Sequence, residues 1–219
     1  IKKKQKWDLS DISEMARAAT QMVNDAIDAY VNDDENLARK VISSDDKIDE
    51  LFVKTKDKII DEIAADKANG EKAIDTLMVA KYFERIGDHA ENVLGYALQM
   101  KEDKRKFSDK ALKNLKELSQ AVYKIYDLAC EHFSNPSEEL YRVIYDLEAD
   151  IDKMVDKMRA SNSKRLSKMK CEAVQGLYFN EILVDLERVA DHSLNIAQAA
   201  KKYEIYDCLL YTSPSPRDS

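Results

Sequence analysis

The sequence predicts an all-α protein made of two tandem, pseudo-symmetric three-helix bundles. Only four of the 219 residues are glycine and a single proline precedes residue 214, whereas good helix formers dominate. Apolar side chains recur at helical spacing along most of the chain. The segment FERIGDHAEN at 83–92 returns as LERVADHSLN at 186–195, with Glu, Arg, Asp, His and Asn each displaced by 103 positions. The chain is therefore a duplication, and antiparallel helical bundles are the usual way to bury such apolar stripes.

The first half is predicted to contain three helices, over residues 11–31, 35–65 and 71–100. Asp11 is followed three residues later by Glu14, which predicts a capping box at the start of the first helix. Together these helices form a predicted unit that spans residues 8–100.

The second half is predicted to follow a charged link at 101–106 and to begin its first helix at Ser108. The NPSE segment at 135–138 predicts a helix start with Asn135 as the N-cap and Pro136 in the first turn. The second and third helices of this half are predicted over 136–169 and 172–203, within a unit that spans 107–204. Residues 205–219 are predicted to be a non-native-looking or disordered tail, because they interrupt the periodicity and hold two of the three prolines.

Composition excludes several classes of protein. A net charge of −7 and a pI near 5.2 argue against nucleic acid as the main partner. No apolar run approaches the roughly 18 residues of a membrane span. The three cysteines show no C-x-x-C spacing, which favours a reducing, cytoplasmic location. No signature of an active site is present, so we do not predict an enzyme.

A second repeated pattern consists of acidic residues four positions apart. Asp45-x-x-x-Asp49 corresponds to Glu148-x-x-x-Asp152, again displaced by 103 positions. Residues four apart share one face of a helix, so these acids can face the Glu-x-x-x-Asp steps of the next helix. Converging carboxylates suit hard or borderline cations, here iron, Mg, Mn or Zn. The predicted metal ligands are Asp45, Asp49, Glu84 and Asp88 in the first half, and Glu148, Asp152, Glu187 and Asp191 in the second.

The alternative interpretation is that these acids form solvated helix faces. Arg85 and Arg188 lie three residues before Asp88 and Asp191, a spacing that allows weak ion pairs. His89 and His192 are offset from the acidic ridge by one residue, so we expect capping or hydrogen-bonding roles for them. The glycine at position 87 predicts close helix packing.

The motifs at 84–89 and 187–192 resemble those of the PhoU family, regulators of bacterial phosphate uptake. The resemblance covers roughly 10–203 and implies two three-helix bundles, with metal ions, in some members multinuclear iron clusters, at the repeated acids. It also implies that the protein damps phosphate import when phosphate is plentiful. The implied partners are the ATPase of a phosphate ABC transporter and a phosphate-sensing histidine kinase, and a homodimer is left open.

A related alternative is the cytosolic PhoU-like domain of a sodium/phosphate cotransporter. Residues 163–199 resemble that domain more closely, whereas 70–90 resemble stand-alone PhoU. The lysines near the non-Met start would suit a chain that follows a membrane span in cis, which would place the protein at the inner face of the membrane. A ferritin-like metal oxidase is a further hypothesis and would require ligands buried inside one bundle.

Overall fold

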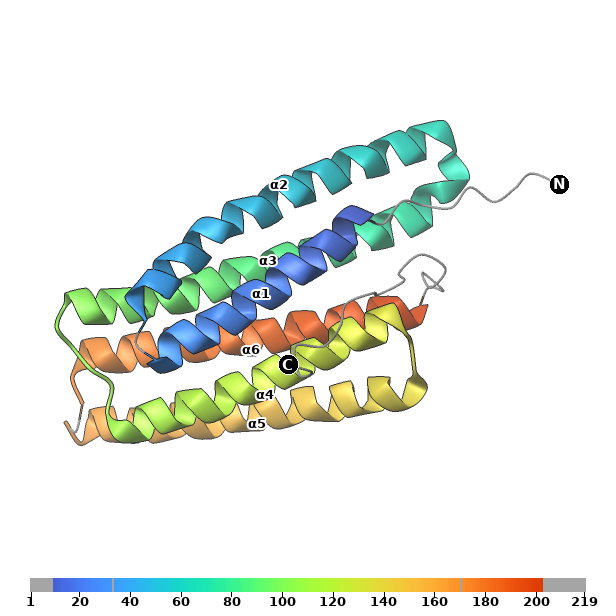
Figure 1. Cartoon of the computed structure of the whole chain (residues 1–219). Helices are drawn as coiled ribbons and strands as arrows, with labels where there is room; N and C mark the ends of the chain where they lie inside the picture. The colour runs from blue at the N-terminus through green and yellow to red at the C-terminus, as the bar shows by residue number, and fades with distance from the viewer. Residues whose placement is uncertain (1–9, 33, 170, 203–219) are drawn as a thin grey trace, which may run out of the picture.

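The computed structural model describes residues 10–32, 34–169 and 171–202, which form two three-helix bundles packed side by side (Figure 1). In the first bundle α1, α2 and α3 pack together, and in the second α4 and α5 pack with α6. The described residues contain no strand, and the all-α prediction is confirmed. The elements are α1 (Ser10–Asn32), α2 (Glu35–Ala65), the short 3-10 helix η1 (Lys67–Asn69), α3 (Gly70–Glu102), α4 (Asp109–Ser134), α5 (Glu138–Ser167) and α6 (Ala173–Lys202).

The ends of α2 match the prediction, with an aspartate at each: the side chain of Asp34 caps the start, and the backbone N–H of Asp66 donates to the carbonyl of Glu62 at the end. The carboxylate of Asp34 accepts a hydrogen bond from the Leu37 amide at 3.0 Å, which satisfies a free donor of the first turn. Asp66 ends the helix and its carboxylate caps η1. The predicted capping box at Asp11 is wrong, because α1 already includes Ser10 and the Asp11 carboxylate instead pairs with Lys54 and Lys58 of α2.

The start of α5 also differs from the prediction. Asn135 ends α4, where its backbone N–H donates to the carbonyl of Glu131. Ser137 is the N-cap of α5, and its hydroxyl accepts a hydrogen bond from the Leu140 amide at 3.3 Å. The helix thus begins two residues later than expected, because the extended backbone at Ser137 provides the cap rather than Asn135. The helix start predicted at Ser108 is confirmed to within one residue, because Ser108 is the N-cap of α4 and its hydroxyl accepts a hydrogen bond from the Ala111 amide.

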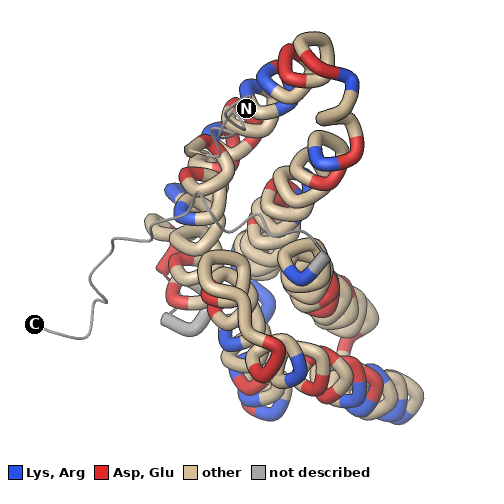
Figure 2. The backbone as a smooth tube through the Cα atoms, turned by 90° about the vertical axis from the view of Figure 1, so that its right-hand side faces the viewer, with Lys and Arg blue, Asp and Glu red and all other residues tan. Residues whose placement is uncertain are grey.

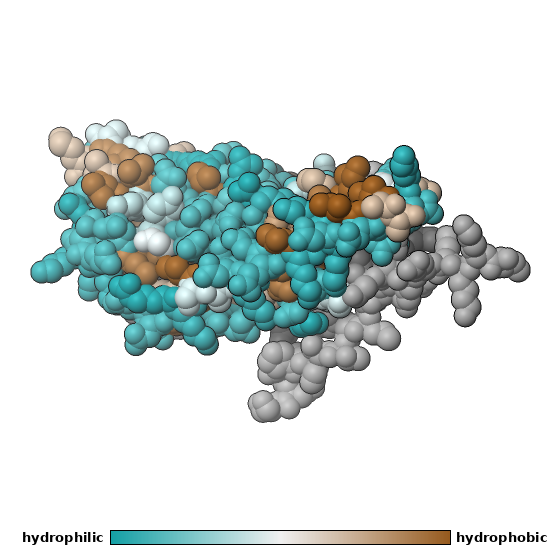
Figure 3. All heavy atoms as spheres, turned by 90° about the horizontal axis from the view of Figure 1, so that it is seen from above, coloured by the Kyte–Doolittle hydropathy of each residue, from teal (hydrophilic) through white to brown (hydrophobic). Residues whose placement is uncertain are grey.

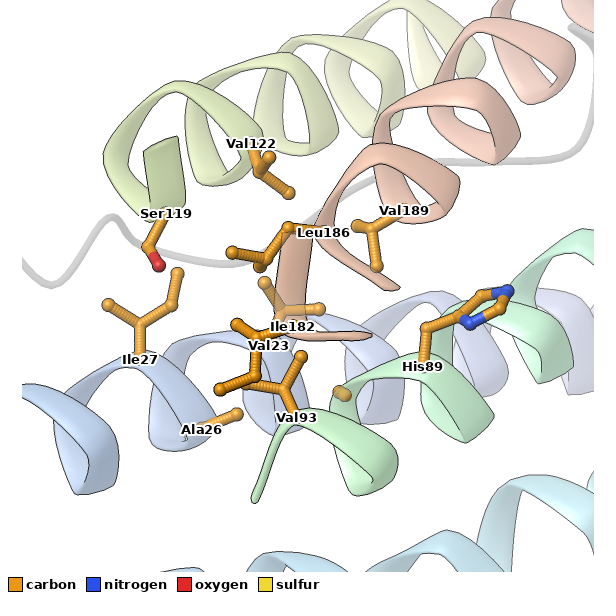
Figure 4. A pocket seen from close by; sticks show the side chains of 11 residues that line it. Val23, Ala26, Ile27, His89, Val93, Ser119, Val122, Ile182, Leu186 and Val189 are labelled. Carbon is orange, nitrogen blue, oxygen red and sulfur yellow. The ribbon is translucent and has the colours of Figure 1, made fainter. Parts of the chain in front are cut away.

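The two bundles join along α3 and α6, whose inner faces belong to one continuous core. Phe83 and Leu94 of α3 and Leu183 and Ile196 of α6 are fully buried. At the centre, apolar side chains from α1, α3, α4 and α6 surround a small cavity with His89 at its edge (Figure 4). This interface fixes how the two halves face each other and brings their repeated motifs together.

The surface of the described residues is predominantly polar. Acidic and basic residues are interspersed along the backbone (Figure 2), and the face seen from above is mostly hydrophilic with separate hydrophobic areas (Figure 3). Among the described residues no helix is long and apolar enough to span a bilayer. The unit boundaries 8–100 and 107–204 stay predictions, and the predicted tail at 205–219 lies outside the described residues.

Candidate metal centres

The first acidic cluster forms where α2 crosses α3. Asp45 and Asp49 project from α2 and Asp88 from α3, and one carboxylate oxygen of each lies within 4.8 Å of the others. The spacing of four residues places both aspartates of α2 on the same side of that helix. Three of the four predicted ligands of the first half therefore meet.

Gly87 allows the close approach on which this cluster depends. A Cβ atom at position 87 would lie 2.5 Å from Oδ1 of Asp45 and 3.1 Å from Cδ1 of Ile48. A Cβ at this position would force the side chain of Asp45 to shift, so the prediction of close helix packing at Gly87 is confirmed. The glycine places the Asp45 carboxylate directly against the backbone of α3.

The environment of Asp45 disfavours an isolated negative charge. Asp45 is only 8% exposed, and its Oδ1 has no hydrogen-bond partner within the described residues. Burial, reinforced by the charges of Asp88, Glu91, Asp49 and Glu84, raises the pKa of Asp45 to about 7. A cation between these carboxylates would supply the missing partner and relieve their repulsion, so the residues fit a metal ion.

The second cluster repeats this arrangement between α5 and α6. Glu148 and Asp152 of α5 and Asp191 of α6 place carboxylate oxygens within 4.8 Å of one another. Burial raises the pKa of Glu148, and the charges of Asp152 and Asp191 raise it further. Burial also raises the pKa of Asp191, although the nearby Arg188 opposes that shift.

The fourth predicted ligand of each half is engaged in ion pairs. Glu84 pairs with Lys81, one helical turn earlier, and its Oε2 lies 3.8 Å from Nε of Arg85. Glu187 accepts hydrogen bonds from both terminal nitrogens of Arg159 on α5, at 2.6 and 3.5 Å. The structure therefore brings together two triads, with Glu84 and Glu187 held beside them by cationic side chains.

The ion pairs expected from the alternative interpretation are also present. Arg85 lies 3.2 Å from Asp88 and Arg188 lies 3.1 Å from Asp191, both at the predicted spacing of three residues. Each pair leaves half of the guanidinium side chain exposed, so solvent and salt weaken it. Each triad thus carries one arginine at its edge, which partly neutralises the acids.

The two histidines next to the clusters meet at the interface between the bundles. His89 donates from Nδ1 to Oδ1 of Asp185 at 2.7 Å, and Asn92 donates to the same oxygen at 3.3 Å. His192 stacks between His89 and Tyr82, with ring centroids 5.5 and 5.7 Å away. The expected hydrogen-bonding role is confirmed for His89. Burial, together with the charges of His89, Arg188 and Arg85, lowers the pKa of His192 to about 4.

Several residues around the site were not predicted from the sequence. Asp185 occupies the position equivalent to Tyr82, so a search for repeated identities passes over it. Lys81 and Arg159 are missed for the same reason, since their counterparts are Val184 and Lys56. A comparison of unlike residues at equivalent positions would have drawn attention to all three.

The fold and its paired acidic clusters define a duplicated helical-bundle protein with one acidic triad in each half. The sequence profile of the PhoU domain matches this chain twice, over residues 12–97 and 115–200, with the same displacement of 103 positions. The chain belongs to the PhoU family.

A curated relative agrees with this assignment, and solved structures share the fold. The chain is 32% identical over 192 residues to "Phosphate-specific transport system accessory protein PhoU homolog 1" of Thermotoga maritima, covering 86% of this chain and 82% of that protein. It is 26% identical to the PhoU homolog of Pseudomonas aeruginosa, covering 86% and 78%. The crystal structure of PhoU from Pseudomonas aeruginosa superposes with a TM-score of 0.80 at 22% identity, covering 87% of this chain and 92% of that one. PhoU from Streptococcus pneumoniae gives 0.76 at 17% identity, covering 87% and 90%.

Proposed function

We propose that this protein is an accessory regulator of phosphate transport, and that it lowers phosphate import when phosphate is plentiful. The observation that carries the proposal is the similarity to the Thermotoga maritima protein, which extends over about four fifths of both chains. Because the relatives described above are accessory proteins, they favour this role over that of a cotransporter domain.

Regulation in this proposal operates through protein contacts at the cytoplasmic side of the membrane. The partners would be the ATPase of a phosphate ABC transporter and a phosphate-sensing histidine kinase, as the family resemblance implies. Acidic and basic residues interspersed along the chain offer polar groups for such contacts (Figure 2).

The acidic triads are proposed to hold metal ions that support this role. Asp45, Asp49 and Asp88 would ligate one cation, and Glu148, Asp152 and Asp191 another, each through carboxylate oxygens. Glu84 and Glu187 lie beside these triads and would each become a fourth ligand on leaving their ion pairs. Oxygen-only donor sets of this kind suit iron, Mg or Mn, and suit Zn less well. A bound cation would cross-link α2 to α3, or α5 to α6, and so stiffen the outer face of each bundle.

A bacterium that lacks its own PhoU tests the regulatory proposal. Such a strain should show uncontrolled phosphate uptake in phosphate-rich medium, measured with radiolabelled phosphate. Expression of this chain is expected to restore low phosphate uptake. A variant that carries Asp45→Asn, Asp49→Asn, Glu148→Gln and Asp152→Asn tests whether the metal sites are needed for this control. Unchanged uptake on expression of the folded wild-type chain would contradict the proposal. Normal control by the variant would show that the metal ions are dispensable for regulation.

A further inference from the structure

We propose that the two acidic clusters have diverged, and that the cluster of Asp45, Asp49 and Asp88 binds a divalent cation more tightly than the cluster of Glu148, Asp152 and Asp191. This inference rests on the metal-binding part of the proposed function. It concerns only residues of this chain that the duplication makes directly comparable.

The first argument is the charge around each triad. Glu91 of α3 lies close enough to Asp88, Asp46 and Asp49 for their charges to act on it. The residues equivalent to Asp46 and Glu91 in the second half are Ala149 and Leu194, so these two negative charges are absent there. A divalent cation at the first triad therefore experiences a more negative potential than one at the second.

The second argument is the burial of the ligands. Asp45 is nine-tenths buried against Gly87, and its Oδ1 lacks a hydrogen-bond partner in the part of the chain that the structure describes. Its counterpart Glu148 is only half-buried and has one more rotatable bond. The first site thus contains a ligand that is already fixed in position and poorly solvated, and both properties favour cation binding.

The third argument is the availability of a fourth ligand. Within the described residues Oε2 of Glu84 is buried without a hydrogen-bond partner, because Lys81 contacts the other oxygen and Nε of Arg85 lies 3.8 Å away. Both oxygens of Glu187 accept hydrogen bonds from Arg159, whose planar fork matches the carboxylate. Glu84 can therefore turn to a cation at lower cost than Glu187, which again favours the first site.

Titration of the metal-free protein with Mn²⁺ tests this order of affinity. Binding is measured by calorimetry and by the electron paramagnetic resonance signal of free Mn²⁺. Two classes of site are expected in the wild-type chain. The pair Asp45→Asn and Asp49→Asn should remove the tight class, whereas Glu148→Gln and Asp152→Asn should remove the weak class. Circular dichroism and thermal unfolding check that each variant folds.

Variants that leave every ligand in place separate charge from ligation. Asp46→Asn with Glu91→Gln is expected to weaken the tight site by about tenfold at low ionic strength, with a smaller effect in high salt. The reciprocal change Ala149→Asp should strengthen the weak site severalfold. Equal affinities, or loss of the tighter class in the Glu148/Asp152 variant, would overturn this inference and leave the proposed metal binding intact. A wild-type chain that binds no Mn²⁺ would refute both the order of affinity and the proposed metal binding. The proposed control of phosphate uptake would still be tested separately, by the uptake measurement in cells.

Discussion

His89 of α3 stacks on His192 of α6 with their ring centroids 5.5 Å apart, and these two residues are equivalent positions of the duplicated chain. The pseudo-two-fold relationship between the bundles therefore passes between the two rings. Each histidine then meets a different neighbour from the opposite half, Asp185 for His89 and Tyr82 for His192. Those neighbours are also equivalent positions, so one symmetric geometry carries two unlike chemical environments.

The contact between His89 and Asp185 is expected to stabilise the interface between the bundles. Asp185 is buried, and among the described residues His89→Phe would leave it the 3.3 Å hydrogen bond from Asn92 alone. We predict a loss of about 2 kcal/mol in the free energy of unfolding, measured with urea. His192→Phe, which keeps the stacked ring, should cost less than half as much. A double-mutant cycle with Asp185→Asn should show coupling for His89, and strictly additive effects would contradict this account.

Gly87 is predicted to tolerate alanine poorly in spite of the higher helix propensity of alanine. The added Cβ would press on Asp45 and Ile48, and such overpacking typically costs about 1–3 kcal/mol. Gly95→Ala on the same helix is the matched control, because its Cβ meets no atom within 4 Å and should add up to about 1 kcal/mol of stability. Equal stabilisation by both substitutions, measured by urea unfolding, would show that α2 and α3 are not in close contact at Gly87.

The pKa of Asp45 predicts a specific dependence of stability on pH in the metal-free protein. This pKa is raised from 3.8 to about 7 in the folded state, so between these values the folded chain binds more protons than the unfolded chain. The contribution of Asp45 to the free energy of unfolding is therefore fully present below about pH 4 and is lost as the pH rises through 7.

Asp45→Asn should remove that dependence. The variant is expected to be more stable than the wild type by about 1–2 kcal/mol at pH 8, with the difference shrinking toward pH 4. Asp57→Asn, on the exposed face of α2, is the control for the loss of one negative charge. Urea unfolding at a series of pH values in the presence of a chelator measures the effect. A constant difference between wild type and Asp45→Asn across the whole range would contradict the prediction.

Arg159 is predicted to restrict the second cluster by holding Glu187. Arg159→Gln removes both hydrogen bonds and the positive charge, so Glu187 becomes free to ligate a cation. We expect the affinity of the second cluster for Mn²⁺ to rise severalfold, measured by calorimetry in the Asp45→Asn, Asp49→Asn background. Lys157→Gln removes an exposed charge from the same helix and serves as the control. Similar effects of both substitutions would show that Arg159 acts only through its positive charge and not by holding Glu187.

The duplication explains which features could be predicted from the sequence. Helical periodicity and the repeat predict six helices, and side-chain caps such as Ser108 fix ends that match the structure. Asp11 misleads because an acid near a helix start can pair with lysines of a neighbouring helix instead of capping. Such long-range pairing depends on tertiary packing, which local sequence does not contain.

The candidate site divides in the same way. Asp45, Asp49 and Asp88 meet because the spacing of four residues and one helix crossing suffice to bring them together. The partners of Glu84 and Glu187 and the contact of His89 with Asp185 depend on residues that differ between the halves. A search for repeated identities detects what the halves share and passes over what distinguishes them.

Anomalous diffraction from crystals grown with Mn²⁺ is the most direct test of the claim that the repeated acidic clusters are cation sites. We predict one peak between Asp45, Asp49 and Asp88 and a second between Glu148, Asp152 and Asp191, with the first stronger when Mn²⁺ is limiting. Crystals with millimolar Mn²⁺ and no anomalous peak at either cluster would contradict the claim.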